Sequence, residues 1–345
     1  MWFNNNAASI DQSVLQQAES YQLTLTKPPG SLGKLEDIAT SFSGFQGQIK
    51  PKLDNIFISI FAGDHGVANK GVSAFPQAVT AEMVKNFAAG GAAISVMARQ
   101  LNANFEVVNT GTAFEVPAHE NIVDVQIAPG TQDFSEQSAM TEAQLIQALA
   151  NGQQAALRAK ESNAHVFIGG EMGIGNTTSA SAIAAAHLGL PAIKLVGPGT
   201  GLDEQKLPFK AAVIEQGLAL HASRDPLHIL KNLGGFEIAG LVGAYIQCAQ
   251  QGTPVLVDGF ISSAAALMAV AINASIRPWL MFSHESAEPG HQLILSKLDA
   301  APLLNIGMRL GEGSGAAVAI SLMQSAVLMH NQMATFEAAG VSEKD

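Results

Sequence analysis

The chain of 345 residues is long enough for one large α/β domain with additions, or for two domains. Only 14% of the residues are charged, 48% are hydrophobic, 33 are glycines and the mean hydropathy is +0.21, yet no apolar run reaches the roughly 18 residues of a membrane span. The net charge is −11 and the 18 basic residues never cluster, which excludes nucleic acid as a partner.

Both ends of the chain have helical sequence patterns. These patterns cover residues 9–25, about 32–48 and about 315–339. We expect these ends to pack together.

Between the ends, short apolar runs rich in β-branched residues alternate with longer helical patterns, which is typical of βαβ units. The expected strands are 56–61, 105–109, 123–127, 166–168, 254–257 and 279–282. The expected helices are 79–99, 142–161, 177–187, 203–221, 236–250 and 262–272. The sequence thus predicts an α/β fold with a Rossmann-like, mostly parallel sheet and helices on both faces. Because most strands end in glycine-containing or polar loops, we expect one ligand site at the carboxyl edge of the sheet.

The N-terminal residues and the only cysteine indicate the compartment. No basic residue precedes Lys27 and no apolar signal segment is present, so secretion is not expected. Cys248 lies in an apolar helical pattern and is expected to be a buried, reduced thiol. Both observations favour a cytoplasmic protein.

The strongest local signal is the segment Gly169 to Thr178, between an expected strand and an expected helix. Its glycines allow a ligand to approach the backbone, and Asn176, Thr177 or Thr178 is expected to cap a helix whose amides face a phosphate or carboxylate. The spacing matches neither the dinucleotide pattern nor the P-loop, so neither cofactor class is predicted. A plain tight turn is the alternative.

Two further glycine-rich loops precede helices. Val196 to Asp203 is either a second phosphate cradle or a rigid loop with Asp203 as a helix cap. Gly311 to Gly315 places Glu312 between glycines directly before a helix. An acidic residue there stabilises the helix dipole, but the three glycines favour a site that a ligand approaches closely.

Other segments carry weaker signals. Asp64 and His65, after the first strand, are more simply loop-ordering residues than a metal or acid–base pair. The stretch His284 to His291 is not the HExxH zinc pattern and contains a Pro-Gly pair, so no metal site is predicted. No serine nucleophile elbow is present.

The segment Val255 to Ser263 lacks the paired acids of a magnesium–pyrophosphate loop. If the protein transfers a phosphoribosyl group, its donor should therefore lack pyrophosphate.

Five segments, taken together, indicate a protein family. They are KPPGSLG (27–33), AGDHGV (62–67), VSAFPQ (72–77), GEMGIGNTT (170–178) and RLGEGSG (309–315). In this order and spacing, over nearly the whole chain, they resemble nicotinate-nucleotide:5,6-dimethylbenzimidazole phosphoribosyltransferases.

The resemblance implies transfer of 5-phosphoribose from nicotinate mononucleotide to 5,6-dimethylbenzimidazole. The products would be nicotinate and α-ribazole 5′-phosphate, for the lower nucleotide loop of cobalamin. Because the family inverts the anomeric centre, the resemblance also implies a single displacement without an enzyme nucleophile. Because nicotinate is already a good leaving group, neither a metal nor another cofactor is expected. The reaction needs a base for the azole proton. By resemblance this base is Glu312, whose pKa an apolar pocket would raise, and Glu171 contacts the ribose or assists.

The other residue roles also come from the resemblance. The pocket for the incoming base comprises Ser73, Gln77, Met172 and Leu310. The methionine and the leucine of this set also fit ordinary core positions. The donor is expected to contact Gly173, Gly175, Asn176, Thr177, Thr178, Gly199, Gly201, Gly311 and Gly313. Which loop holds the phosphate and which the nicotinate carboxylate stays open. No role transfers to Asp64, His65, Ser283 or His284.

The resemblance further implies two domains, a small helical domain of residues 1–50 with 320–345 and a Rossmann-like catalytic domain of residues 51–319. It also implies a homodimer whose neighbouring subunit reaches towards the site. Two other interpretations stay open. A relative that uses another lower-ligand base, such as adenine, a phenol or a methoxybenzimidazole, would have the same scaffold and the same Glu312. A non-catalytic, nucleotide-binding Rossmann-like protein would not need a carboxylate between glycines.

Overall fold

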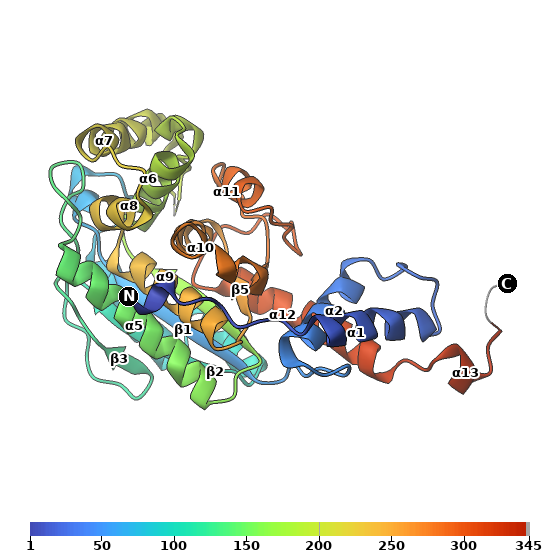
Figure 1. Ribbon diagram of the computed structural model, residues 1–345. Helices are drawn as coiled ribbons and strands as arrows, with labels where there is room; N and C mark the ends of the chain where they lie inside the picture. Colours follow the sequence, from blue (N-terminus) through green and yellow to red (C-terminus); the bar gives the residue numbers. More distant parts are fainter. Residues whose placement is uncertain (200, 343–345) are drawn as a thin grey trace.

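A six-stranded sheet forms the centre of the molecule in the computed structural model, which describes residues 1–199 and 201–342 (Figure 1). Two parts of the predicted segments lie outside the described residues. These are Thr200, in the loop before Asp203, and residues 343–345, at the end of the predicted helical domain.

All strands of the sheet are parallel, in the order β3-β2-β1-β4-β5-β6. Their bounds are β1 (Ile56–Gly63), β2 (Asn104–Gly111), β3 (Ile122–Asp124), β4 (Val166–Met172), β5 (Val255–Val257) and β6 (Leu280–Phe282). Each predicted strand is present, which confirms the predicted α/β class. The strand order reverses between β1 and β4, and ligands bind at the carboxyl ends of the strands at such a point.

The two faces of the sheet bury separate hydrophobic cores. Ile58 and Ile60 of β1 belong to one core, whereas Phe57 and Phe61 belong to the other, because successive side chains of a strand point to opposite faces. The first face packs against α3 (Ala78–Ala89), α4 (Ala93–Gln100) and α12 (Ser314–Gln332). The second lies under α5 (Glu142–Glu161), α9 (Phe236–Gln250) and α10 (Phe260–Ile272). The predicted helices on both faces are therefore confirmed.

Further helices are present beside these two layers and at the end of the molecule that holds the termini (Figure 1). They are α1 (Gln12–Thr24), α2 (Lys34–Gln46), α6 (Asn176–Leu188), α7 (Leu207–Leu220), α8 (Pro226–Leu233), α11 (His291–Lys297) and α13 (Phe336–Ala339). The predicted helix 203–221 begins as a short 3₁₀ turn that Asp203 caps through the amide of Gln205. Within the described ranges, no helix has the length and apolar character needed to cross a membrane.

Two predicted helices are interrupted. The predicted helix 79–99 is divided into α3 and α4, because Gly90 adopts a left-handed conformation (φ +85°) that ends α3. The predicted helix 315–339 stops at Gln332, because Met333 is extended and the Thr335 side chain caps a new helix, α13.

Helices from both termini lie side by side at one end of the molecule (Figure 1). Leu25 pairs with Thr335 in an isolated bridge, and the Gln22 amide lies 2.7 Å from the His330 ring. α12 runs from the carboxyl edge of the sheet to this end without interruption, so the predicted boundary at residue 320 falls inside a helix. The division into residues 1–50 with 320–345 and residues 51–319 stays a prediction.

Candidate active site

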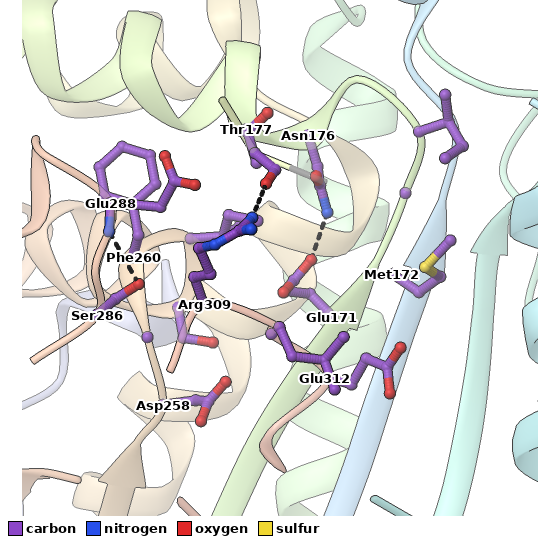
Figure 2. Close-up of a pocket in the computed structure, with 18 of the residues that line it drawn as sticks. Glu171, Met172, Asn176, Thr177, Asp258, Phe260, Ser286, Glu288, Arg309 and Glu312 are labelled. Carbon is purple, nitrogen blue, oxygen red and sulfur yellow. Dashed lines mark hydrogen bonds between the residues drawn. The ribbon is translucent and has the colours of Figure 1, made fainter. Parts of the chain in front are cut away.

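A pocket of roughly 1020 Å³, part of it open to solvent, lies at the carboxyl edge of the sheet (Figure 2). Its walls come from the segments that follow β4, β5 and β6, from residues 309–312 before α12, and from residues 73–83 before and within α3. The fold thus brings together segments that are far apart in the sequence, at the place where open parallel sheets bind ligands.

Most of the predicted site residues line this pocket. They are Ser73, Glu171, Met172, Gly173, Gly175, Asn176, Thr177, Gly199, Leu310, Gly311 and Glu312. Four predicted residues are not part of this lining, namely Gln77, Thr178, Gly201 and Gly313. The Gln77 side chain donates to the carbonyl of His65 at 2.9 Å, and the Thr178 side chain is fully buried.

The start of α6 differs from its prediction. None of Asn176, Thr177 and Thr178 caps the helix, because α6 begins after Gly175, which has a left-handed conformation (φ +99°) and no side chain. The Asn176 amide instead donates to the Glu171 carboxylate (Figure 2). Asn176 therefore fixes an acidic side chain in the pocket rather than the helix end.

Glu312 occupies the centre of a left-handed turn. Gly311, Glu312 and Gly313 have φ values of +84°, +64° and +77°. This conformation costs a residue with a side chain about 1–2 kcal/mol, so the surrounding structure must hold Glu312 in place. A Cβ atom on Gly170 of β4 would lie 2.6 Å from the Glu312 carbonyl group. The turn can pack on the sheet only because residue 170 is a glycine.

The environment of Glu312 makes its carboxyl group a weak acid. The residue is only 8% exposed and its side chain lines the pocket. Burial, together with the negative charge of Asp258, raises the pKa of Glu312 to about 7. A carboxyl group with such a pKa suits proton transfer near neutral pH.

Glu171 is a second acidic group of the pocket. Burial, together with the charges of Asp258 and Glu237, raises the pKa of Glu171 well above its usual range. A Cβ atom on Gly311 would lie 2.5 Å from Glu171 Oε1, so the glycines of the turn also make room for this side chain. The pocket thus combines acidic groups that hold protons more tightly than exposed carboxyl groups do.

Two cationic side chains were assigned no role from the sequence, Arg309 in the pocket lining and Lys210 buried beside it. Arg309 donates to the carbonyl of Gly199 at 3.0 Å. Lys210 of α7 donates to Thr177 Oγ1 at 2.9 Å and to the Gly197 carbonyl at 3.1 Å, and burial lowers its pKa to about 8. Arg309 begins the segment 309–315, but no role was predicted for it, and no motif marks Lys210. They place positive charge beside the glycine loops.

Apolar side chains surround the mouth of the pocket. Leu310 is 50% exposed and Phe75 is 48% exposed, and Val79, Met83 and Met172 lie nearby in the lining. The exposure of Leu310 excludes the core position that its sequence also allowed. A flat apolar ring at this mouth would remove these side chains from water.

The weaker sequence signals have structural explanations. Asp64 accepts hydrogen bonds from Thr80 Oγ1 at 2.6 Å and from the amide of Ala113 at 2.8 Å. His65 pairs with Glu237 at 2.6 Å. Both arrangements agree with the loop-ordering interpretation.

The segment after β6 contributes His284 to the pocket, and Ser283 Oγ lies 3.0 Å from its Nδ1 atom. His284 and His291 do not share a helix, because α11 begins only at His291. Over residues 1–199 and 201–342, no group of three or more His, Cys, Asp or Glu side chains is placed to hold a metal ion.

The sheet order, the glycine loops and the acidic pocket at the carboxyl edge indicate an α/β enzyme with a ligand site at that edge. A family model described as "Phosphoribosyltransferase" matches residues 7–341. The chain belongs to the nicotinate-nucleotide–dimethylbenzimidazole phosphoribosyltransferase family, as the following relatives show.

The chain is 54% identical to the nicotinate-nucleotide–dimethylbenzimidazole phosphoribosyltransferase of Pseudomonas fluorescens, over 99% of this chain and 98% of that protein. It is 52% identical to the protein of the same name from Azotobacter vinelandii, with the same coverage. The crystal structure of the Thermus thermophilus enzyme superposes with a TM-score of 0.92 at 39% identity, covering 97% of this chain and all of that one.

Glu312→Gln is expected to stabilise the protein at pH 8 but to have little effect near pH 4. The folded-state pKa of about 7 lies above the usual value of 4.5, so the folded protein binds the proton more tightly than the unfolded chain. Wild-type stability therefore falls as the pH rises from about 4 to 7. A glutamine avoids this loss, and the gain at pH 8 should be on the order of 3 kcal/mol in urea unfolding.

Glu19→Gln provides the matched control, because Glu19 is an exposed carboxylate of α1. Its effect on stability should not change over the same pH range. Equal pH dependence of the two variants would show that burial does not raise the pKa of Glu312.

Proposed function

We propose that the protein transfers 5-phosphoribose from nicotinate mononucleotide to 5,6-dimethylbenzimidazole. The products are nicotinate and α-ribazole 5′-phosphate, the nucleotide of the lower loop of cobalamin. The relatives' names supply the two substrates. The observation that carries the proposal is Glu312, a carboxyl group with a pKa of about 7 in a pocket with an apolar mouth.

The reaction is a single displacement at C1′ of the ribose. The unprotonated azole nitrogen attacks C1′ while the bond to the pyridinium nitrogen breaks, and the bonding electron pair leaves with nicotinate. The azole ring then carries a positive charge, which it loses when Glu312 accepts the proton from its other nitrogen. Glu171 is proposed to contact the ribose or to assist, because it lies beside the same turn in the pocket lining.

The walls of the pocket divide between the two substrates. Lys210 and Arg309 stand beside the glycine loops, which favours this side for the anionic groups of the nucleotide. Phe75, Met172 and Leu310 form the apolar mouth, which favours that side for the benzimidazole ring. Ser73 lines the same mouth and is proposed to contact the incoming base.

Incubation of the purified protein with nicotinate mononucleotide and a panel of bases tests the function. The panel contains 5,6-dimethylbenzimidazole, a methoxybenzimidazole, adenine and a phenol. We expect nicotinate release and an α-configured product, with dimethylbenzimidazole preferred in competition. Preference for another base would support the alternative relative, and no nicotinate release with any base would support a non-catalytic nucleotide-binding protein.

Glu312→Gln should lower turnover at least about a hundredfold, because general-base catalysis contributes roughly 10²–10⁴ in rate. Binding of both substrates, measured by calorimetry, should be preserved. In the wild type, kcat/KM should rise with pH and level off above about 7, where Glu312 loses its proton. Glu19→Gln serves as the control. Wild-type turnover in Glu312→Gln would remove the general-base assignment.

We also infer that the protein is a homodimer. Apolar side chains are exposed on the terminal helices, namely Leu23 of α1 and Leu322 and Leu328 of α12. The motif 27–33 lies between α1 and α2 and does not line the pocket of its own chain. A neighbouring subunit that brings this motif to the pocket would explain both observations.

Sedimentation at micromolar concentration should give a dimer, and a monodisperse monomer would contradict the inference.

A cytoplasmic location stays a prediction that one structural feature supports. Cys248 is a free, buried cysteine of α9. Burial raises the pKa of its thiol well above the usual value, so the group is neutral and unreactive. A reduced core thiol of this kind is compatible with a reducing compartment.

A further inference from the structure

Asp258 caps the helix that follows Glu312, although the two residues are distant in the sequence. Asp258 directly follows β5 and is 1% exposed. Its Oδ2 atom accepts a hydrogen bond from the amide of Gly313 at 3.2 Å, and its Oδ1 atom accepts one from the amide of Ala316 at 2.9 Å. The first amides of a helix have no partner within the helix. One side chain from the sheet therefore satisfies two backbone groups of this turn.

The sequence of α12 provides no cap of its own. Its N-cap residue is Gly313, which has no side chain, and the first turn contains no acidic residue. Ser314 closes the turn locally, with its hydroxyl donating to the Gly311 carbonyl at 2.6 Å. Both partners of that bond lie within the turn, so it does not connect the turn to the sheet. Asp258 supplies the hydrogen bonds that tie the turn to the end of β5.

Several charged or titratable groups face this arrangement from the neighbouring elements. They are Glu171 of β4, Glu237 and Tyr245 of α9, His284 after β6, and Arg309 and Glu312 of the turn segment. His284 Nδ1 lies 3.8 Å from Asp258 Oδ1. Burial raises the pKa of Asp258, whereas His284 and the backbone amides oppose that rise. The two amides and the helix dipole favour an ionised carboxylate.

We propose that Asp258 is the positioning residue of the general base. By holding the amides of Gly313 and Ala316, it fixes the left-handed turn and thereby the direction of the Glu312 carboxyl group. Its charge also makes Glu312 a stronger base. This inference rests on the proposed function of Glu312, and it adds a residue that acts on the reaction through Glu312.

Two substitutions separate the charge of Asp258 from its position. Asp258→Asn removes the charge, and its amide group then faces a backbone N–H. We expect kcat to fall about ten- to a hundredfold with a nearly unchanged KM for nicotinate mononucleotide. The rising part of the pH profile of kcat/KM, its acid limb, should move to lower pH by about half a unit or more. The reason is that Glu312 loses a negatively charged neighbour that raises its pKa. Asp258→Glu keeps the charge but displaces it, so kcat should fall while the acid limb stays in place.

Asp64→Asn is the matched control. Asp64 is also a buried aspartate directly after a strand, and it also accepts a backbone amide, but it does not line the pocket. Its substitution should lower thermal stability and leave the acid limb unchanged. Three results would overturn the proposal: an unchanged limb in Asp258→Asn, wild-type kcat in Asp258→Glu, or an equal shift in Asp64→Asn.

A stability measurement tests the same coupling without catalysis. The pH at which the stability gain from Glu312→Gln levels off is measured in the wild-type and the Asp258→Asn backgrounds, because this pH follows the folded-state pKa of Glu312. In the second background it should lie lower by about half a unit or more. An unchanged levelling-off pH overturns the proposal. A wild-type protein that releases no nicotinate, but shows the shifted levelling-off pH, overturns the proposed function alone.

Discussion

Three consecutive left-handed residues, Gly311 to Gly313, are the constraint on which the site depends. The turn places a carboxyl group in a mostly apolar pocket at the start of a helix, and the protein contains several features that this placement requires. Gly170 lacks a side chain where the turn packs on β4, and Gly311 leaves space for Glu171. Part of the high glycine content of the chain therefore serves close contacts around one acidic side chain.

The fold was largely predictable because its physical signals are local. β1 is buried along its whole length, and a strand covered on both faces has the continuous apolar sequence that made it recognisable. Helix ends were less predictable. The break at Gly90 and the restart at Thr335 depend on single residues within otherwise helical patterns. The short helices α8 and α11 were missed, because few turns leave little periodicity to detect.

The site was predictable only where glycines cluster beside a polar residue, as they do around Glu312. Asp258 and Lys210 carry no such signal, and the segment that contains Arg309 does not reveal its role, because the contacts of these residues come from other segments that the fold brings to them. The same limit explains the prediction for Asn176. Its position at a helix start suggested a cap, whereas its partner is Glu171, five residues earlier on β4.

The central claim is that the fold keeps Glu312 protonated until near-neutral pH without any substrate. Carbon-13 NMR of protein labelled at the glutamate side-chain carboxyl carbons tests it most directly, because Glu312→Gln identifies the signal by removing it. We predict that this one signal titrates with a pKa of about 7 in the free protein. A Glu312 signal that titrates between about pH 4 and 5, as exposed glutamates do, would contradict the account.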